Sequence, residues 1–173
     1  MAGMFRELRA DEIECRVSRI VEGKKDTGVI LLLYKDARCD MNALDEAVGQ
    51  MNWQCKYSRE NANCEVGIYD SDKHEWIWKE DTGTESNAEA QKGLASDSFK
   101  RACFKWGIGR ELYTSPFIWV SVKDCDSYQD KSGAWHCTDS FKVRLIDYDN
   151  GCVSKLVIEN KHHNIVFTCG DMR

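Results

Sequence analysis

The chain has 173 residues, of which 42% are hydrophobic and 31% charged, and this balance is typical of a single globular domain. Its longest apolar run, Val29–Tyr34, is far too short to cross a bilayer. The N-terminal segment MAGMFRELRADE lacks the basic and then apolar stretches of a signal peptide. We therefore expect a cytoplasmic protein without a membrane partner.

Nine cysteines are many for this length, but no pair has the CxxC spacing. The odd count argues against a disulfide framework. We expect reduced thiols that act as small apolar residues. A zinc site remains an alternative, although its spacing matches no structural zinc pattern; its ligands would be Cys125, His136, Cys137 and Cys152.

The net charge of −5 argues against nucleic acid as a partner until the charges are followed along the chain. Residues 60–89 hold nine acidic and two basic side chains, whereas residues 90–110 hold five basic and one acidic. A phosphate backbone responds to the local field within a Debye length of roughly 10 Å. The segment 90–110 is therefore a candidate phosphate-binding surface in an acidic protein.

The first half of the chain predicts two helices and several strands. A short helix is expected over residues 4–12. Asp40 can cap a second helix over Met41–Val48, which Gly49 ends. Strands are predicted where apolar and polar residues alternate or where apolar residues form a short run: residues 13–19, 29–34, 53–58, 64–69 and 74–79.

The most clearly bounded element is a helix that ends near Trp106. Residues 86–89, Ser-Asn-Ala-Glu, form a capping box at its start, and the glycines of residues 107–109 stop it. At helical spacing, one apolar stripe is made of Ala88, Ala95, Phe99, Ala102, Cys103 and Trp106. The opposite side carries Lys100, Arg101 and Lys105. The helix is therefore expected to pack on a sheet with one face and to present positive charge on another.

After Pro116 the pattern returns to strands, predicted over residues 117–122, 141–146, 153–158 and 165–168. Residues 149–151, Asp-Asn-Gly, are a strong signal for a hairpin turn. The element order predicts an α+β fold in which two or three antiparallel strands precede the main helix, with short flanking helices and additional C-terminal strands. We expect one domain, with a core over residues 1–120 and a C-terminal β extension over 121–173.

Aromatic side chains could supply stacking surfaces for nucleic-acid bases, at ~1–3 kcal/mol for each base. The candidates are Trp53, Tyr57, Tyr69, Trp76, Trp78, Trp106, Tyr113 and Trp119. Aromatic residues at strand and helix spacing more often belong to the core. Only a ring that is exposed beside a basic surface would therefore serve as a platform.

A metal-dependent nuclease is an alternative function. Glu159 and Lys161 form an ExK tripeptide at the end of one predicted strand, and Asp147 ends the preceding strand. Two such acids can hold Mg²⁺ while the lysine lies near an attacking water. The signal is weak because residues of these types recur by chance and hairpin edges readily end in charged residues.

The sequence contains no motif for nucleotide-driven chemistry. It has no GxxxxGK[ST] phosphate loop, no nucleophile elbow and no HExxH. The glycines of residues 107–109 follow a helix instead of opening one, so they are not a dinucleotide-binding fingerprint. We expect a protein that is not an enzyme and needs neither ATP nor a cofactor.

One segment carries a family resemblance. Residues 92–102, KGLASDSFKRA, followed by KWGIG at residues 105–109, resemble the central helix of the Rad52-type single-strand annealing proteins, especially small bacteriophage members of the Sak kind. Residues 34–38, residues 49–53 and the opening at residues 13–17 are similar to the same family. The resemblance covers roughly residues 5–120.

The resemblance implies an antiparallel β-β-β-α core and a ring of identical subunits with a positively charged groove that holds single-stranded DNA. It assigns Lys100, Arg101 and Arg16 to DNA contacts. Charge and position add Arg38, Lys105 and Arg110. Exposed strand edges near Val29–Tyr34 or Phe141–Ile146 could supply the head-to-tail contact between subunits.

The implied function is ATP-independent binding of single-stranded DNA and annealing of complementary strands in homologous recombination and DNA repair. A recombinase or a single-strand-binding protein is a possible further partner. The net acidic charge departs from the family pattern. So does the missing long C-terminal partner-binding region, which argues against a mediator role. A DNA-end-protecting module without annealing activity remains a second alternative.

Overall fold

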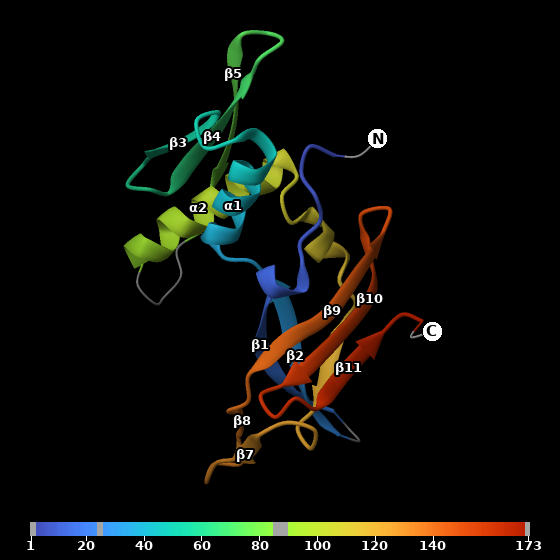
Figure 1. Ribbon diagram of the computed structural model, residues 1–173. Coiled ribbons are helices and arrows are strands. Elements are labelled where there is room, and N and C mark those ends of the chain that lie inside the picture. The colour runs from blue at the N-terminus through green and yellow to red at the C-terminus, as the bar shows by residue number, and fades with distance from the viewer. Residues whose placement is uncertain (1–2, 24–25, 85–89, 172–173) are drawn as a thin grey trace. The chain divides into compact units, whose positions relative to one another are not determined.

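The computed structural model describes residues 3–23, 26–84 and 90–171, and the chain divides into two compact units (Figure 1). Unit 1 comprises Met1–Glu7 and Lys35–Arg110, and unit 2 comprises Leu8–Tyr34 and Glu111–Arg173. Two α-helices and mainly antiparallel strands make the protein α+β, as predicted. None of the helices in the described ranges is long and apolar enough to span a membrane.

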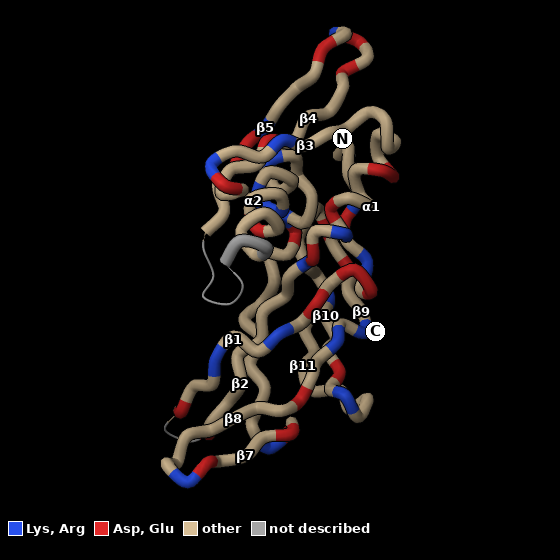
Figure 2. The backbone as a smooth tube through the Cα atoms, turned by 90° about the vertical axis from the view of Figure 1, so that its left-hand side faces the viewer, with Lys and Arg blue, Asp and Glu red and all other residues tan. Residues whose placement is uncertain are grey.

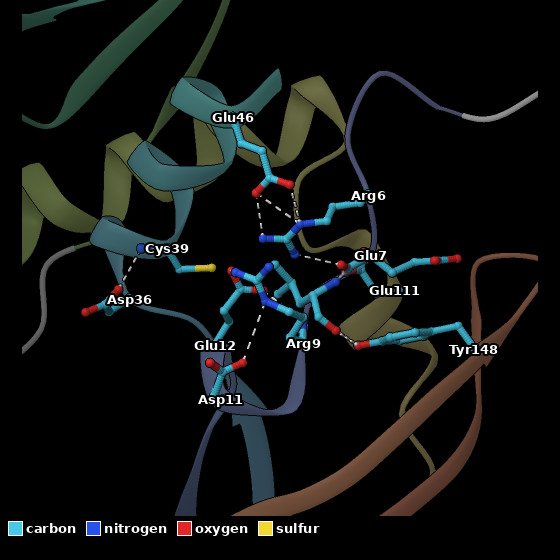
Figure 3. Close-up of polar contacts among 11 residues, drawn as sticks. Arg6, Glu7, Arg9, Asp11, Glu12, Asp36, Cys39, Glu46, Glu111 and Tyr148 are labelled. Carbon is cyan, nitrogen blue, oxygen red and sulfur yellow. Dashed lines mark hydrogen bonds and ion pairs between the residues drawn. The ribbon is translucent and has the colours of Figure 1, made fainter. Parts of the chain in front are cut away.

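Helix α1 of unit 1 (Ala37–Val48) begins earlier than predicted. Its N-cap is Asp36, whose side chain accepts a hydrogen bond of 2.8 Å from the backbone N–H of Cys39 (Figure 3). Asp40, the predicted cap, lies in the first turn of the helix and is fully buried. Aspartate is a common N-cap residue, so the sequence pattern permits either residue as the cap. The burial of Asp40 in the first turn leaves Asp36 as the N-cap. Gly49 ends the helix with a positive φ of 83°, as predicted.

The three central strands of unit 1 form an antiparallel sheet in the order β3-β4-β5. These strands are β3 (Trp53–Ser58), β4 (Asn63–Asp70) and β5 (Glu75–Thr82). Cys64, Val66 and Ile68 alternate along β4 and are all buried, so one face of the sheet is the core face. The predicted strands are confirmed, with boundaries that differ by up to three residues.

Helix α2 (Ala90–Trp106) packs on this core face. Of the predicted apolar stripe, Phe99, Ala102 and Cys103 are fully buried, whereas Ala95 and Trp106 are partly buried. Leu94, which was not predicted in the stripe, is also buried. The helix ends at Trp106 as expected. Residues 86–89, predicted as the capping box, and Ala88 within them lie outside the described residues.

A short N-terminal segment completes unit 1. The guanidinium of Arg6 donates from Nε and Nη2 to the carboxylate of Glu46 on α1, at 2.9–3.1 Å (Figure 3). Phe5 packs against the core cluster of this unit. The predicted helix over residues 4–12 is reduced to a single 3₁₀ turn, η1 (Ala10–Glu12), which belongs to unit 2.

Unit 2 is built on a six-stranded sheet in the order β11-β10-β9-β1-β2-β6. The strands are β1 (Glu14–Glu22), β2 (Thr27–Tyr34), β6 (Ile118–Ser121), β9 (Phe141–Asp149), β10 (Cys152–Asn160) and β11 (Ile165–Cys169). The β9–β10 turn contains Asn150 and Gly151, both with positive φ, as the hairpin signal predicted. All the predicted C-terminal strands are therefore present.

Three small elements of unit 2 have weak sequence signals. The 3₁₀ helix η2 (Arg110–Thr114) begins at the boundary between the two units. Strands β7 (Ser127–Gln129) and β8 (Trp135–Cys137) form a separate hairpin. Each strand has only three residues, which is too short for a periodic pattern to stand out.

Each unit combines two separate stretches of the chain, and strand pairing determines which stretches belong together. β1 pairs with β9 at Glu14↔Lys142 and Cys15↔Phe141, which joins the N-terminal hairpin to the C-terminal strands. The sequence predicted a boundary between residues 1–120 and 121–173, whereas residue 120 lies within β6 of unit 2. Pairing between segments so distant in sequence leaves no local signal.

The strands predicted as exposed edges lie inside the six-stranded sheet. β2 is flanked by β1 and by β6, which pairs with Gly28–Leu31. β9 is flanked by β10 and, at its first two residues, by β1. The outermost strands of this sheet are β6 and β11. Val29–Leu31 and Phe141–Lys142 are therefore paired on both sides, whereas residues 32–34 have no β6 partner and residues 143–146 have no β1 partner. The prediction of edges at Val29–Tyr34 and Phe141–Ile146 is wrong for the paired parts only.

Candidate nucleic-acid interface

Helix α2 and its C-terminal end carry four of the six predicted DNA-binding residues. The basic residues of this segment are visible on the charge-coloured backbone (Figure 2). Lys100 is half-buried, whereas Arg101, Lys105 and Arg110 are exposed. Phe99, Ala102 and Cys103 on the core face of the helix are fully buried. Their packing fixes the rotation of the helix and so the side on which the basic residues lie.

Arg101 is held by an acid on its own helix. Its Nε donates to Asp97 Oδ2 at 2.9 Å, and the same oxygen accepts from the backbone N–H of Thr84 at 2.9 Å. Burial raises the pKa of Asp97, but these two donors lower it more, so the pKa lies below its usual value. Asp97 is therefore ionised at neutral pH and offsets part of the charge of Arg101.

Lys100 lies near a buried ion pair. Lys35 Nζ donates to Asp40 Oδ1, and the side chains of Lys35 and Asp40 are only 8% and 0% exposed. Asp40 Oδ2 has no hydrogen-bond partner. Burial raises the pKa of Asp40 to about 6, while the positive charges of Lys35 and Lys100 act in the opposite direction. Lys100 therefore acts on the Asp40 carboxylate together with Lys35, and the negative charge of Asp36 opposes them.

The C-terminal end of α2 gathers three cations. Arg110 donates to the carbonyl oxygens of Phe104 and Lys105 at 2.8 and 2.6 Å. Lys79 donates to the Lys105 carbonyl at 3.2 Å and lies 4.2 Å from the ring centroid of Trp106. Cations at this end stabilise the helix dipole and satisfy its last carbonyls. Arg110 therefore has a helix-capping role that the sequence did not reveal.

Lys105 and Arg38 are paired with acids at the surface. Lys105 Nζ lies 3.6 Å from Asp81, and Arg38 Nε lies 2.8 Å from Asp36, the N-cap of α1. The side chain of Arg38 is 86% exposed. Exposed pairs of this kind contribute little to stability, roughly 0–1 kcal/mol, so a phosphate can compete for either cation.

Arg16 belongs to unit 2, where it lies on strand β1. Its guanidinium carbon is 4.6 Å from the ring centroid of Tyr34 on the neighbouring strand. The pairing Arg16↔Leu32 places it on the outward face of the β1–β2 hairpin. Unit 1 thus contains Arg38, Lys100, Arg101, Lys105 and Arg110, and unit 2 contains Arg16.

Most of the candidate aromatic residues have structural contacts. Trp106 Nε1 donates to the Val66 carbonyl at 3.0 Å, and Trp53 contacts Phe99 in the core, with ring centroids 6.1 Å apart. Trp76 and Trp78 lie on the face of the β3-β4-β5 sheet opposite to the core, as their pairing with Tyr69 and Gly67 requires. The hydrogen bond to Val66 supports the expectation that Trp106 belongs to the core.

The residues of the predicted nuclease site are not brought together. In an antiparallel hairpin the end of one strand faces the start of the next. Asp147 therefore pairs with Lys155 near the turn, whereas Glu159 pairs with Lys142 at the other end of the hairpin. Lys161 forms an ion pair of 2.7 Å with Asp126. The ExK tripeptide thus has no acidic partner at Asp147.

The proposed zinc ligands do not form a single cluster. His136 Nε2 lies 2.8 Å from Asp130 Oδ2, and Cys152 is exposed at the start of β10. Cys125 and Cys137 contact each other, and burial raises the pKa of Cys125 to about 12. Within residues 3–23, 26–84 and 90–171, no group of three or more His, Cys, Asp or Glu side chains could hold a metal ion.

Comparison with known families identifies the segment that contains α1, the β3-β4-β5 sheet and α2. The Rad52/22 family of double-strand break repair proteins matches residues 35–132, which is more than half of the chain. The chain belongs to this family. No curated protein and no solved structure matches it significantly.

The Rad52/22 match agrees with the expected resemblance over residues 35–120 and differs at both ends. It leaves out β1 and β2, where the resemblance predicted an Arg16 contact, and extends to residue 132. It includes all of Lys35–Arg110, the larger segment of unit 1. Five of the six predicted DNA-binding residues therefore lie within the matched segment.

Proposed function

We propose that this Rad52/22 family member binds single-stranded DNA and anneals complementary strands without ATP, as a homo-oligomer that acts in homologous recombination. The observation that carries the proposal is the basic side of α2 within the family-matched segment. The resemblance to small bacteriophage annealing proteins adds a phage origin and a location in the host cytoplasm.

The contact with DNA is electrostatic. Lys100 has no ion pair among the described residues, and its neighbour Arg101 is 45% exposed. Lysine and arginine that neutralise phosphates release counterions, so the binding is independent of sequence and sensitive to salt. Phosphate contacts leave the base edges free to search for a complement. Pairing then supplies the free energy, at ~1.4 kcal/mol for each base-pair step of DNA stacking.

Self-association increases the affinity of a small basic patch for single-stranded DNA. One α2 offers few cations, but a ring of copies repeats Lys100 and Arg101 along a continuous track. Linked weak sites increase the overall affinity without any new contact. Multivalency of this kind reconciles a net charge of −5 with a polyanionic ligand. We propose a recombinase or a single-strand-binding protein of the host as an additional partner.

The test is annealing of two complementary fluorescent oligonucleotides, without ATP and with EDTA. We expect fast annealing by the native chain that weakens with salt and is lost in Lys100→Ala/Arg101→Ala. The matched control is Lys73→Ala/Lys131→Ala, which removes two positive charges from exposed residues in the turns of the β4–β5 and β7–β8 hairpins.

Each alternative predicts a different result. A DNA-end-protecting module would bind the oligonucleotides and slow exonuclease digestion without accelerating annealing. A nuclease would degrade DNA when Mg²⁺ replaces EDTA. Equal annealing by the native chain and the α2 variant would contradict the assignment of the DNA contact to this helix.

A further inference from the structure

One tryptophan of unit 2 lies flat on the outward face of the six-stranded sheet. The opposite face is the core, because Val29, Leu31 and Val120 are 0–2% exposed. A Cβ atom added to Gly28 would lie 2.0 Å from Cε2 and Nε1 of Trp119. The indole of Trp119 therefore covers Gly28, and only glycine leaves room for it.

The side chains around Trp119 on this face come from three strands and border the buried Ile30. Directly paired residues share a face of a sheet, and the pairs Arg19↔Ile30 and Ile30↔Trp119 place Arg19 and Trp119 on the same face. The pair Arg16↔Leu32 lies beside them. We call the outward side chains Arg16, Arg19, Val21, Leu32, Tyr34 and Trp119 the Trp119 face.

The Trp119 face leaves large apolar side chains uncovered. Leu32 is 47%, Val21 38% and Trp119 37% exposed. Phe117, two residues before Trp119, is 69% exposed and has the spacing that places side chains on the same side of an extended chain. Adjoining apolar residues exposed in this way, with a charged border, mark a binding surface.

The charged border of the face is mainly basic. Arg16 and Arg19 are exposed on β1. Lys142 pairs with Glu14 across the β1–β9 contact. Arg144 is 56% exposed and lies 3.6 Å from Glu159. Lys123 forms an ion pair with Asp26, which accepts a hydrogen bond from Ser121 beside Gly28. The border thus has five cations and three carboxylates, and Arg16 and Arg19 have no ion pair among the described residues.

We propose that the Trp119 face is a second contact surface for single-stranded DNA, with bases stacked on Trp119 and phosphates bound by Arg16 and Arg19. An exposed indole and flanking arginines are the combination that sequence-independent binders use, with ~1–3 kcal/mol for each stacked base. The positive border favours a polyanion over an acidic or neutral partner surface. The inference rests on the proposed ligand, and it extends the contact from Trp119 of β6 to the arginines of β1, which lies outside the family-matched segment.

The experiment measures the binding of a fluorescein-labelled oligo(dT) by anisotropy at several salt concentrations. Trp119→Ala is expected to weaken binding roughly fivefold or more, and Trp119→Tyr to restore most of the affinity. Gly28→Ala keeps the indole but displaces it from the sheet, and we expect a loss in the same direction. The control is Tyr128→Ala, which removes an aromatic residue of unit 2 that is 52% exposed and stacked on His136.

Arg16→Gln/Arg19→Gln tests the phosphate contacts. We expect the slope of log affinity against log salt to fall by about one for each arginine that contacts a phosphate. An unchanged slope and unchanged binding by Trp119→Ala would overturn the inference, even if Lys100→Ala/Arg101→Ala abolishes annealing and so upholds the proposed function. A Trp119→Ala protein that binds DNA normally but sediments as a smaller species would also overturn it, because the face would then be a contact between copies.

Discussion

At the scale of single residues, Lys35, Asp40 and Lys100 set the electrostatics beneath α2. Asp40 is buried with one oxygen bonded to Lys35 and the other without a partner. A buried carboxylate is costly unless its charge is compensated, and the positive charges of Lys35 and Lys100 only partly offset the burial that raises its pKa to about 6. The sequence suggested a helix cap at this position, and the structure shows a buried charge.

Asp40→Asn tests this site through pH. Because the pKa of Asp40 lies above its ordinary value of 3.8, the folded protein holds a proton that the unfolded chain releases between about pH 4 and about pH 6. The contribution of Asp40 to stability is therefore fully present below about pH 4 and is lost as the pH rises to about 6. Relative to Asp40→Asn, the native protein should lose on the order of 1–3 kcal/mol across this range. Urea unfolding of both proteins at each end of the pH range measures this difference in the free energy of unfolding. If the free energy of unfolding changed equally with pH in both proteins, a raised pKa of Asp40 would be contradicted.

Asp97 is the second residue whose role the sequence did not reveal. It bonds to the Thr84 backbone and to Arg101, so it fixes the arginine and also neutralises part of its charge. Asp97→Asn keeps an oxygen for the Thr84 N–H but removes the negative charge. We expect severalfold tighter binding of oligo(dT) at low salt and a smaller gain at high salt. A gain in affinity that does not depend on salt would indicate that the substitution changed the shape of the binding surface instead of its charge.

At the scale of elements, the sequence predicted α2 well because a buried stripe at helical spacing and terminal glycines are local signals. It did not predict how closely β5 approaches the helix. The chain after β5 passes α2 at Gly83, where a Cβ atom would lie 2.8 Å from the Ser98 backbone nitrogen and 3.0 Å from the Leu94 carbonyl. Because both are backbone atoms of the helix, they cannot move aside to make room for a Cβ atom as a flexible side chain could.

Gly83→Ala should therefore destabilise unit 1 by about 1–3 kcal/mol, because overpacking displaces either the strand or the helix. The midpoint of urea unfolding measures the effect, and Thr84→Ala, an exposed neighbour, is the control. The basic side of α2 would move with the helix, so DNA binding should weaken in parallel. Full stability of Gly83→Ala would mean that the approach is looser than the structure shows.

At the scale of the whole molecule, the proposed activity depends on many copies. If the basic track is continuous across subunits, oligonucleotides long enough to reach several subunits should bind far more tightly than short ones of equal total nucleotide concentration. Analytical ultracentrifugation together with a length series of oligo(dT) tests this. A monomeric chain whose affinity does not depend on length would contradict the ring and leave the basic patch of α2 acting alone.

Local patterns in the sequence were sufficient to predict four features: the β3-β4-β5 strands, the buried stripe and end of α2, the Asn150-Gly151 turn and the basic segment around Lys100. Features that depend on contacts between distant segments became visible only in the folded chain. Pairing of β1 with β9 fixed the two units, burial selected Asp36 over Asp40 as the cap, and antiparallel geometry separated Asp147 from Glu159. The physical reason is that periodicity records which face of an element is buried, whereas the partner that buries it is set by the packing of the whole chain.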